Sequence, residues 1–368
     1  MQVKWNEINA LPVKTWRWLG VNGDITKLAA PQIKHYTGKP FSGKVPAGAE
    51  IYDIADGKIV FMDNEADLPQ NPEVLQFIKK NRSAGFSVRI APNGRVDEPI
   101  VFDYRINAQN PAVVDENLIV AEEGSEATVV MHYASDNDAE GFHCGLTKVI
   151  AKKNAKVKLV QVQTLGDGCD HFDNVSTLAL DGAHIEVVQA ELGGRRAFAN
   201  CREKLAGERS GLDMSAVYLG DGSREIDFNV VAEHFGKRSQ SSITAHGALF
   251  GSSRKIFRGT IDFKKGASGS RGREEENTML LGPGVHNRTA PLILCAEEDV
   301  DGHHAASVGH IDTDRMFYLM SRGLNELEAK KLLIEAEFEP VTAKIPVPAF
   351  RQEISDFLKG RLNRIESI

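Results

Sequence analysis

The sequence is poor in cysteine and has no long apolar run. Its four cysteines are widely spaced and form no C-x-x-C pair, which argues against a disulfide framework and against a structural zinc site built from them. They are Cys144, Cys169, Cys201 and Cys295. The sequence contains no run of about 18 apolar residues, so no membrane span is predicted. The first residues, MQVKWNEINA, lack the apolar segment of a secretory signal. We therefore expect a cytoplasmic protein in a reducing setting.

An excess of positive charge is also missing. The 368 residues include 44 Lys and Arg against 51 Asp and Glu, giving a net charge of −7, which argues against nucleic acid as the main partner. The chain has no G-x-x-x-x-G-K-[ST] motif for nucleotide hydrolysis, no G-x-S-x-G nucleophile elbow and no H-E-x-x-H metal motif. These absences favour a protein that is not an enzyme of those classes.

The middle of the chain contains a repeat of 27 to 30 residues. Each copy has an alanine, then polar residues, then a glycine or asparagine three positions after the alanine, then an alternating apolar run. The copies occupy residues 121–129, 151–159 and 179–187, with a looser copy at 206–214. The alternation indicates β-strands, while Gly124, Asn154 and Gly182 predict turns with positive φ.

Such a fixed period favours stacked coils, because each strand–turn–strand unit buries its apolar face only against its neighbours. We therefore predict a mainly β fold with a β-solenoid core over residues 111–310. A β-sandwich is the alternative, since it also has many short strands.

The N-terminal region, residues 1–110, is predicted to mix strands with one helix. Short strands are expected at residues 51–54, 58–62, 86–90 and 100–104, and a helix is expected to begin after Asn71 with Pro72 at its first position. Trp16 and Trp18 lie close together near the start of the chain. Large aromatic side chains near a terminus usually need burial, so we expect them to pin this segment onto the main domain; the alternative is a partner-docking site.

The C-terminal region, residues 311–368, is predicted to be helical. Asp312 or Thr313 should cap a first helix, and Asn325 should cap a second, with Glu328 completing a capping box. Spacing predicts one buried face on the second helix, formed by Ala329, Leu332, Leu333 and Ala336. These helices could close the end of the solenoid or hold a partner.

At the C-terminal end of the predicted solenoid core, residues 297–310 hold four carboxylates and three histidines. Those histidines are His303, His304 and His310. Imidazole and carboxylate together suit borderline metals and proton transfer, so this segment is the candidate site. The alternative is a solvated loop before the next helix. Because His303 and His304 are adjacent, only one of them can face a site.

The segment DVDGHHAASVGHIDTDRMFYLMSRGLNELEAKKLL resembles the signature region of the SufB/SufD family of iron–sulfur cluster assembly scaffolds. Residues 243–247, 257–261, 276–282 and 15–19 are similar to further stretches of that family. The resemblance implies a right-handed parallel β-helix between a small N-terminal region and a C-terminal helical subdomain. It also implies a non-catalytic scaffold that pairs with a SufB-like subunit through the β-helix.

The resemblance further implies that a SufC-like ATPase docks on the C-terminal helices. The matching positions here are Arg315, Phe317, Tyr318, Arg322 and Gly323. The isolated chain would hold no stable cofactor, whereas iron or a nascent iron–sulfur cluster would pass through the complex.

Within the family, the chain resembles the SufD branch. His304 falls on the position of the SufD histidine implicated in cluster assembly, and Ala305 stands where the SufB branch has glutamate. Ala216 and Val285 stand where SufB chains have cysteine, so the thiolates would come from the partner. Cys295 is expected to be a buried strand cysteine. His303, His286 and His310 have no assigned role.

Two other functions fit parts of the pattern. One is a stand-alone β-helix enzyme of the polysaccharide-lyase type, which would need a groove lined by carboxylates and arginines. The other is a homodimeric SufB-like scaffold, and a homodimer of the isolated chain is also compatible with the SufD-like hypothesis.

Overall fold

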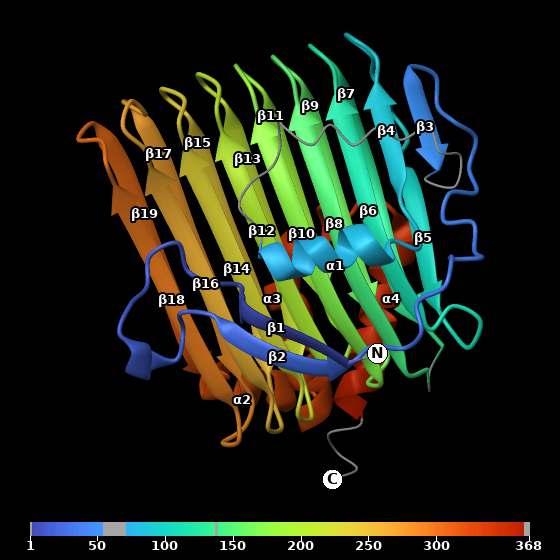
Figure 1. Cartoon of the computed structure of the whole chain (residues 1–368). Coiled ribbons are helices and arrows are strands. Elements are labelled where there is room, and N and C mark those ends of the chain that lie inside the picture. The colour runs from blue at the N-terminus through green and yellow to red at the C-terminus, as the bar shows by residue number, and fades with distance from the viewer. Residues whose placement is uncertain (1, 54–70, 137–138, 364–368) are drawn as a thin grey trace.

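The computed structural model describes residues 2–53, 71–136 and 139–363, and it shows a parallel β-solenoid with helices on its outside (Figure 1). Each turn of the coil contributes one strand to each of two facing sheets. The first sheet consists of β3 (Ala49–Asp53), β4 (Phe86–Ile90), β6 (Ala112–Ala121), β8 (Gly141–Ala151), β10 (Cys169–Ala179), β12 (Arg196–Leu205), β14 (Glu225–His234), β16 (Arg254–Phe263) and β18 (His286–Cys295). The second consists of β5 (Ile100–Ile106), β7 (Glu126–Ser135), β9 (Lys156–Thr164), β11 (His184–Glu191), β13 (Gly211–Gly220), β15 (Gln240–Leu249), β17 (Ser270–Leu280) and β19 (Val300–His310).

The strand register follows the sequence repeat. Ala121 pairs with Ala151, and Ala151 pairs with Ala179, so the predicted copies lie directly above one another. Ala179 then pairs with Leu205 and not with Ala206, which places the looser copy one residue out of step. Parallel pairing already begins at β4 and β5, on the N-terminal side of residue 111. The solenoid prediction is therefore confirmed, and the sandwich alternative is wrong.

The predicted turn residues have the left-handed backbone that the pattern requires. Gly124, Asn154 and Gly182 have φ of 68°, 56° and 63°. In the looser copy the same place is taken by Arg209, with φ of 56°. A glycine or asparagine adopts this conformation at little cost, so the chain folds back at the same point in the first three copies, and the looser copy keeps the turn although arginine lacks that freedom.

The first sheet carries the N-terminal elements on its outer face (Figure 1). They are helix α1 (Pro72–Asn81) and the antiparallel hairpin of β1 (Gln2–Ile8) and β2 (Asp24–Ala29). Trp5 pins the hairpin, because its ring meets Phe77 of α1 at 5.3 Å and Phe172 of β10 at 4.9 Å between centroids. The helix starts as predicted, since Asn71 accepts hydrogen bonds from the first turn.

Trp16 and Trp18 do not pin this region, contrary to expectation. Their side chains are 73% and 79% exposed; Trp16 precedes a short 3-10 helix, η1 (Arg17–Leu19), and Trp18 lies within it. The strand predicted at residues 58–62 lies outside the described residues.

The second sheet is covered by the C-terminal helices α3 (Glu326–Thr342) and α4 (Pro348–Asn363). Ile334, Phe338 and Val341 of α3 are buried against it. Of the predicted buried face, Ala329 is buried, whereas Leu332 is 45% exposed and Ala336 is also exposed, so the prediction is wrong for these two. The Asn325 capping box is present as predicted. Because α3 and α4 lie along the face of a sheet, they do not close the end of the solenoid.

The two ends of the solenoid differ. At the first end, β3 pairs antiparallel with β4, and the rings of Tyr36 and Phe41 pack at 5.6 Å on Tyr104 and Phe102 respectively. By strand pairing alone β3 and β5 at the first end and β18 and β19 at the other end each have one sheet neighbour within the described chain, but at the first end residues 36–41 also cover β5, where Asp103 N donates to Pro40 O at 2.9 Å. We call the other end, formed by β18 and β19, the open end. None of the helices in the described chain is long and apolar enough to cross a membrane.

Candidate functional site at the open end

The open end is an exposed strand edge. Residues 303–310 of β19 are all exposed, and the strand carries the small residues Ala305, Ala306, Ser307 and Gly309. An unpaired strand presents a row of free backbone N–H and C=O groups, and small side chains let a further strand approach closely. The candidate segment is therefore an edge strand, and the predicted solvated loop is wrong.

The two adjacent histidines of β19 point to opposite sides, as predicted from their spacing. His303 faces outward, where its Nε2 lies 2.8 Å from Asp301 Oδ1. Gly302 faces the interior, because a Cβ built on it would lie 3.1 Å from Phe263 and 3.2 Å from Ile293. Strand alternation then places His304 on the interior side of the open end, next to Glu274 of β17, its register partner.

Beneath the open end lies a buried polar cluster, which we call the Lys255–Glu276 cluster. Lys255 and Glu276 form a fully buried ion pair. Glu276 also accepts hydrogen bonds from Tyr218 Oη at 2.8 Å and from Thr289 Oγ1 at 2.7 Å. A buried ion pair is retained only when its remaining polar atoms are satisfied, and here Tyr218 and Thr289 supply those bonds.

Glu274 lies beside this cluster and is only 2% exposed. Burial and the nearby Glu276 raise the pKa of Glu274 to about 8, so its carboxyl is neutral at pH 7. One of its oxygens, Oε2, has no hydrogen-bond partner among the described residues. The interior side of the open end therefore combines a histidine with a protonated carboxyl.

Cys295, at the end of β18, is exposed, so its predicted burial is wrong. It follows Ile293 by two residues and so shares its interior side of the strand. The other three cysteines are buried, and burial raises the pKa of the Cys144 and Cys201 thiols well above the usual range. Cys295 is thus the accessible thiol of the four.

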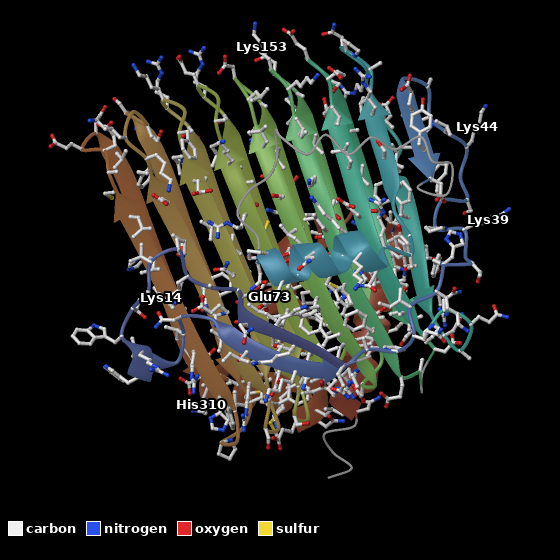
Figure 2. The ribbon with its side chains drawn as sticks, in the orientation of Figure 1. Lys14, Lys39, Lys44, Glu73, Lys153 and His310 are labelled. Atoms are coloured by element: carbon white, nitrogen blue, oxygen red, sulfur yellow. The ribbon has the colours of Figure 1, made fainter. Side chains whose placement is uncertain are left out.

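His310 and His286 lie at ends of β19 and β18. His310 closes β19, and its Nδ1 lies 3.3 Å from Leu280 O (Figure 2). His286 begins β18 and is exposed. Neither ring approaches His304 through any hydrogen bond in the described structure, so neither joins the candidate site.

A second exposed surface follows β19 directly. Helix α2 (Thr313–Ser321) is capped by Asp312, as predicted, and has no buried residue. Phe317 and Tyr318 are 75% and 56% exposed, and Met320 is 45% exposed. We call these three side chains the α2 patch.

Charged side chains of both signs surround the α2 patch, since Asp312 and Asp314 begin the helix. The Arg322 guanidinium lies 5.2 Å from the Tyr318 ring, and Arg315 pairs with Asp312. Gly323, with φ of 100°, ends the segment. Exposed aromatic side chains beside arginine are typical of protein interfaces.

The interior also holds a network of four polar side chains that the sequence pattern did not predict. His143 Nε2 lies 2.7 Å from Asp115 Oδ1, His143 Nδ1 lies 2.8 Å from His171 Nδ1, and His171 Nε2 lies 3.5 Å from Glu191 Oε2. All four side chains are fully buried between the sheets. Polar residues at alternate strand positions normally indicate a solvated face, so the sequence pattern gave no sign of this interior network.

No three His, Cys, Asp or Glu side chains in the described part of the chain are grouped so that they could hold a metal ion. The candidate site thus consists of His304 with Glu274 beneath it at an unpaired edge, and of the α2 patch. His304 lies at the open end. The second surface, around α2, carries the five residues predicted to contact an ATPase: Arg315, Phe317, Tyr318, Arg322 and Gly323.

Comparison with known proteins identifies relatives across most of the chain. A sequence model of the SUF system FeS cluster assembly SufBD core domain matches residues 104–337, more than half of the sequence. The iron–sulfur cluster assembly protein SufD of Bacillus subtilis (strain 168) is 28% identical over 282 residues, which cover 76% of this chain and 64% of that protein.

Two further relatives are also named as SufBD family proteins. An iron–sulfur cluster assembly SufBD family protein of Staphylococcus saprophyticus is 24% identical over 315 residues, covering 80% of this chain and 67% of that protein. One from Mycobacterium leprae is 26% identical over 266 residues, covering 71% of this chain and 30% of that protein. The chain therefore spans about two thirds of the length of the first two relatives and less than a third of the last.

Proposed function

This chain belongs to the SufBD family of the SUF iron–sulfur cluster assembly system, on its SufD branch, and we propose that it is a non-catalytic scaffold subunit of such an assembly complex. In this proposal the open end is where a SufB-like subunit pairs with it. The observation that carries the proposal is the uncovered edge of β18 and β19, whereas at the first end residues 36–41 pack over β5.

The sequence of the open end favours strand addition on β19. Pro291 lies within β18, and a proline lacks the N–H that a neighbouring strand would need. β19 is 11 residues long, contains no proline and has small side chains. A SufB-like subunit that adds a strand here would continue the second sheet across the joint. The same edge would let two copies of this chain pair in isolation.

His304 is the residue of this chain that we assign to the nascent cluster. Its side chain lies on the interior side of the open end, where a partner's edge would cover it. An imidazole nitrogen can bind iron, which is here cargo and not a resident cofactor. Cys295 is the accessible thiol of this chain at the open end, and Ala216, buried in β13, carries none, so further thiolates at this joint would come from the partner.

The α2 patch is the proposed docking surface for a SufC-like ATPase. Phe317 and Tyr318 would supply buried aromatic contacts, while Arg315 and Arg322 would add charge. Because α2 follows β19 after only two residues, a movement of α2 would be passed directly to the open end. Closure of the ATPase on nucleotide would then twist the joined solenoids and open the covered site around His304.

The experiment compares two adjacent histidines. His304→Ala removes the proposed ligand, and His303→Ala is the matched control because His303 points outward to Asp301. Each variant is purified with the SufB-like and SufC-like chains of the same organism, and the iron and sulfide assembled on the complex are measured. We expect His304→Ala to lower the cluster yield at least about tenfold, since loss of even a group that only orders a metal ligand costs about that much, while His303→Ala retains it. Equal yields for the two variants would remove His304 from the mechanism.

A further inference from the structure

The described structure has a pair of tryptophans that its own core does not use. Trp16 and Trp18 are 73% and 79% exposed, and Val13 and Leu19 beside them are 52% and 39% exposed. Tryptophan is the side chain with the largest apolar surface, and contiguous exposed apolar surface on a protein usually marks an interaction site.

The loop that carries them is built to hold its shape. We call residues 15–22 the tryptophan loop. Asn22 Oδ1 accepts hydrogen bonds from Thr15 N at 2.6 Å and Thr15 Oγ1 at 3.0 Å, and Asn22 Nδ2 donates to Thr15 O at 3.0 Å. Gly20, with φ of 65°, closes the short helix by donating to Arg17 O. The two rings are thus presented on a fixed backbone, which lowers the entropy cost of binding.

The tryptophan loop is fastened beside the open end. Arg258 of β16, which is fully buried, donates from Nε to Val21 O and pairs with Asp227. Arg288 of β18 donates from Nη1 to Gly20 O at 3.3 Å. Because β18 is the last strand of the first sheet, the tryptophans lie at its flank, and Lys14, just before the loop, lies toward the same edge of the molecule as His310 (Figure 2).

We propose that the tryptophan loop is a second contact for the SufB-like subunit that pairs with the open end, inserting Trp16 and Trp18 into an apolar recess on the flank of that subunit. This inference rests on the proposed function, since it assigns a further surface to the same partner. The loop is continuous with the open end and fixed to its last strand, so a subunit that covers β18 and β19 also reaches the two rings.

The chemistry of the loop defines the recess that would receive it. Arg17 stands between the tryptophans, is exposed, and has no ion pair within the described residues. The recess on the partner is therefore apolar with a carboxylate at its rim. Interfaces typically place such an arginine and aromatic pair at energetic hot spots.

The test uses the full chain and the SufB-like chain of the same organism. Trp16→Ala/Trp18→Ala is compared with Phe235→Ala, a control aromatic that is 41% exposed in the turn after β14, and with Asn22→Ala, which releases the loop but keeps both rings. We expect the double variant to weaken pairing at least about thirtyfold, equivalent to about 2 kcal/mol at 1.4 kcal/mol per tenfold. Asn22→Ala should weaken it less, and Phe235→Ala should have no effect.

A second measurement follows the rings directly. The chain has three tryptophans, so labelling with 5-fluorotryptophan gives three ¹⁹F resonances, of which buried Trp5 is an internal reference. Addition of the partner should shift the two exposed resonances and leave that of Trp5 in place.

The outcomes separate this inference from the proposed function. If the partner binds both the double variant and wild type equally, and only the Trp5 resonance or none shifts, the loop is not a contact although the scaffold function stands. If Val308→Asp in β19 also leaves pairing unchanged, the proposed function fails as well. Shifts of Trp16 and Trp18 with phospholipid vesicles or with a second copy of the chain, but not with the SufB-like chain, would overturn the inference.

Discussion

A carboxylate placed at Val308 tests whether the open end is covered in the complex. Val308 lies on β19 in register with Thr278, whose hydroxyl is 2.7 Å from Tyr218 Oη in the interior. It therefore faces the interior side of the open end, and it is 45% exposed in the free chain. The free chain should tolerate Val308→Asp with a loss of about 1 kcal/mol, because the carboxylate still reaches water.

A bound partner would remove that water. Covering an uncompensated carboxylate at an apolar joint costs about 3 kcal/mol or more. At 1.4 kcal/mol per tenfold, the affinity of Val308→Asp for the SufB-like chain should fall at least about 100-fold. Phe235→Asp is the matched control, because it adds the same charge at an exposed apolar side chain in the turn after β14.

Sedimentation velocity or calorimetry with the purified SufB-like chain measures the effect. Circular dichroism of each variant alone shows that its fold is retained. Binding of Val308→Asp within about threefold of wild type, together with intact control binding, would mean that the partner does not cover the open end.

Two further predictions concern other parts of the molecule. Burial raises the pKa of Glu203 from 4.5 to about 8, so the folded state holds a proton that the unfolded state releases, and stability should fall as the pH rises from 4.5 to 8. At 1.36 kcal/mol per pH unit, this carboxyl alone lowers the free energy of unfolding by about 4 kcal/mol between pH 5 and pH 8. Glu203→Gln should remove that part of the pH dependence when unfolding is measured by urea titration. The same change of unfolding free energy with pH in both proteins would contradict the assignment. Phe317→Ala/Tyr318→Ala should lower the affinity for the SufC-like ATPase at least about thirtyfold while leaving pairing with the SufB-like chain intact, since both rings lie on α2 and not at the open end; loss of both interactions, or of neither, in pull-down with purified chains would contradict separate surfaces.

The solenoid could be predicted because its signal is local and repeated. Gly124, Asn154 and Gly182 occur at the same place in successive copies, and each needs positive φ. The slip at Leu205 could not be foreseen, since a strand register is set by packing on both neighbours and not by one alanine. The helix starts at Asn71, Asp312 and Asn325 could also be predicted, because capping depends on a few neighbouring residues in the sequence.

What a side chain faces was harder to predict. Leu332 matched a helical spacing but is exposed, because α3 rests on the sheet through Ile334 and Phe338. Cys295 follows an apolar run and is nevertheless exposed, because the sheet ends at its strand. Trp5, which gave no motif, is the aromatic that pins the hairpin.

The candidate site was predictable in part. His304 came from resemblance and from its neighbours in the sequence, and the structure places it at an unpaired edge. Glu274, Glu276 and Lys255 could not be assigned to the site, because they come from two consecutive strands in facing sheets, β17 and β16, and alternation alone does not tell inside from outside.

Hydrogen–deuterium exchange at the backbone amides of β18 and β19 tests most directly whether a sister subunit completes this solenoid. In the free chain, those amides of β19 that do not bond to β17 should exchange rapidly. Addition of the SufB-like chain should slow their exchange, most strongly over residues 303–309, while the outermost strands β3 and β5 at the first end stay unchanged. Bound partner with unchanged exchange in β19 would contradict the account.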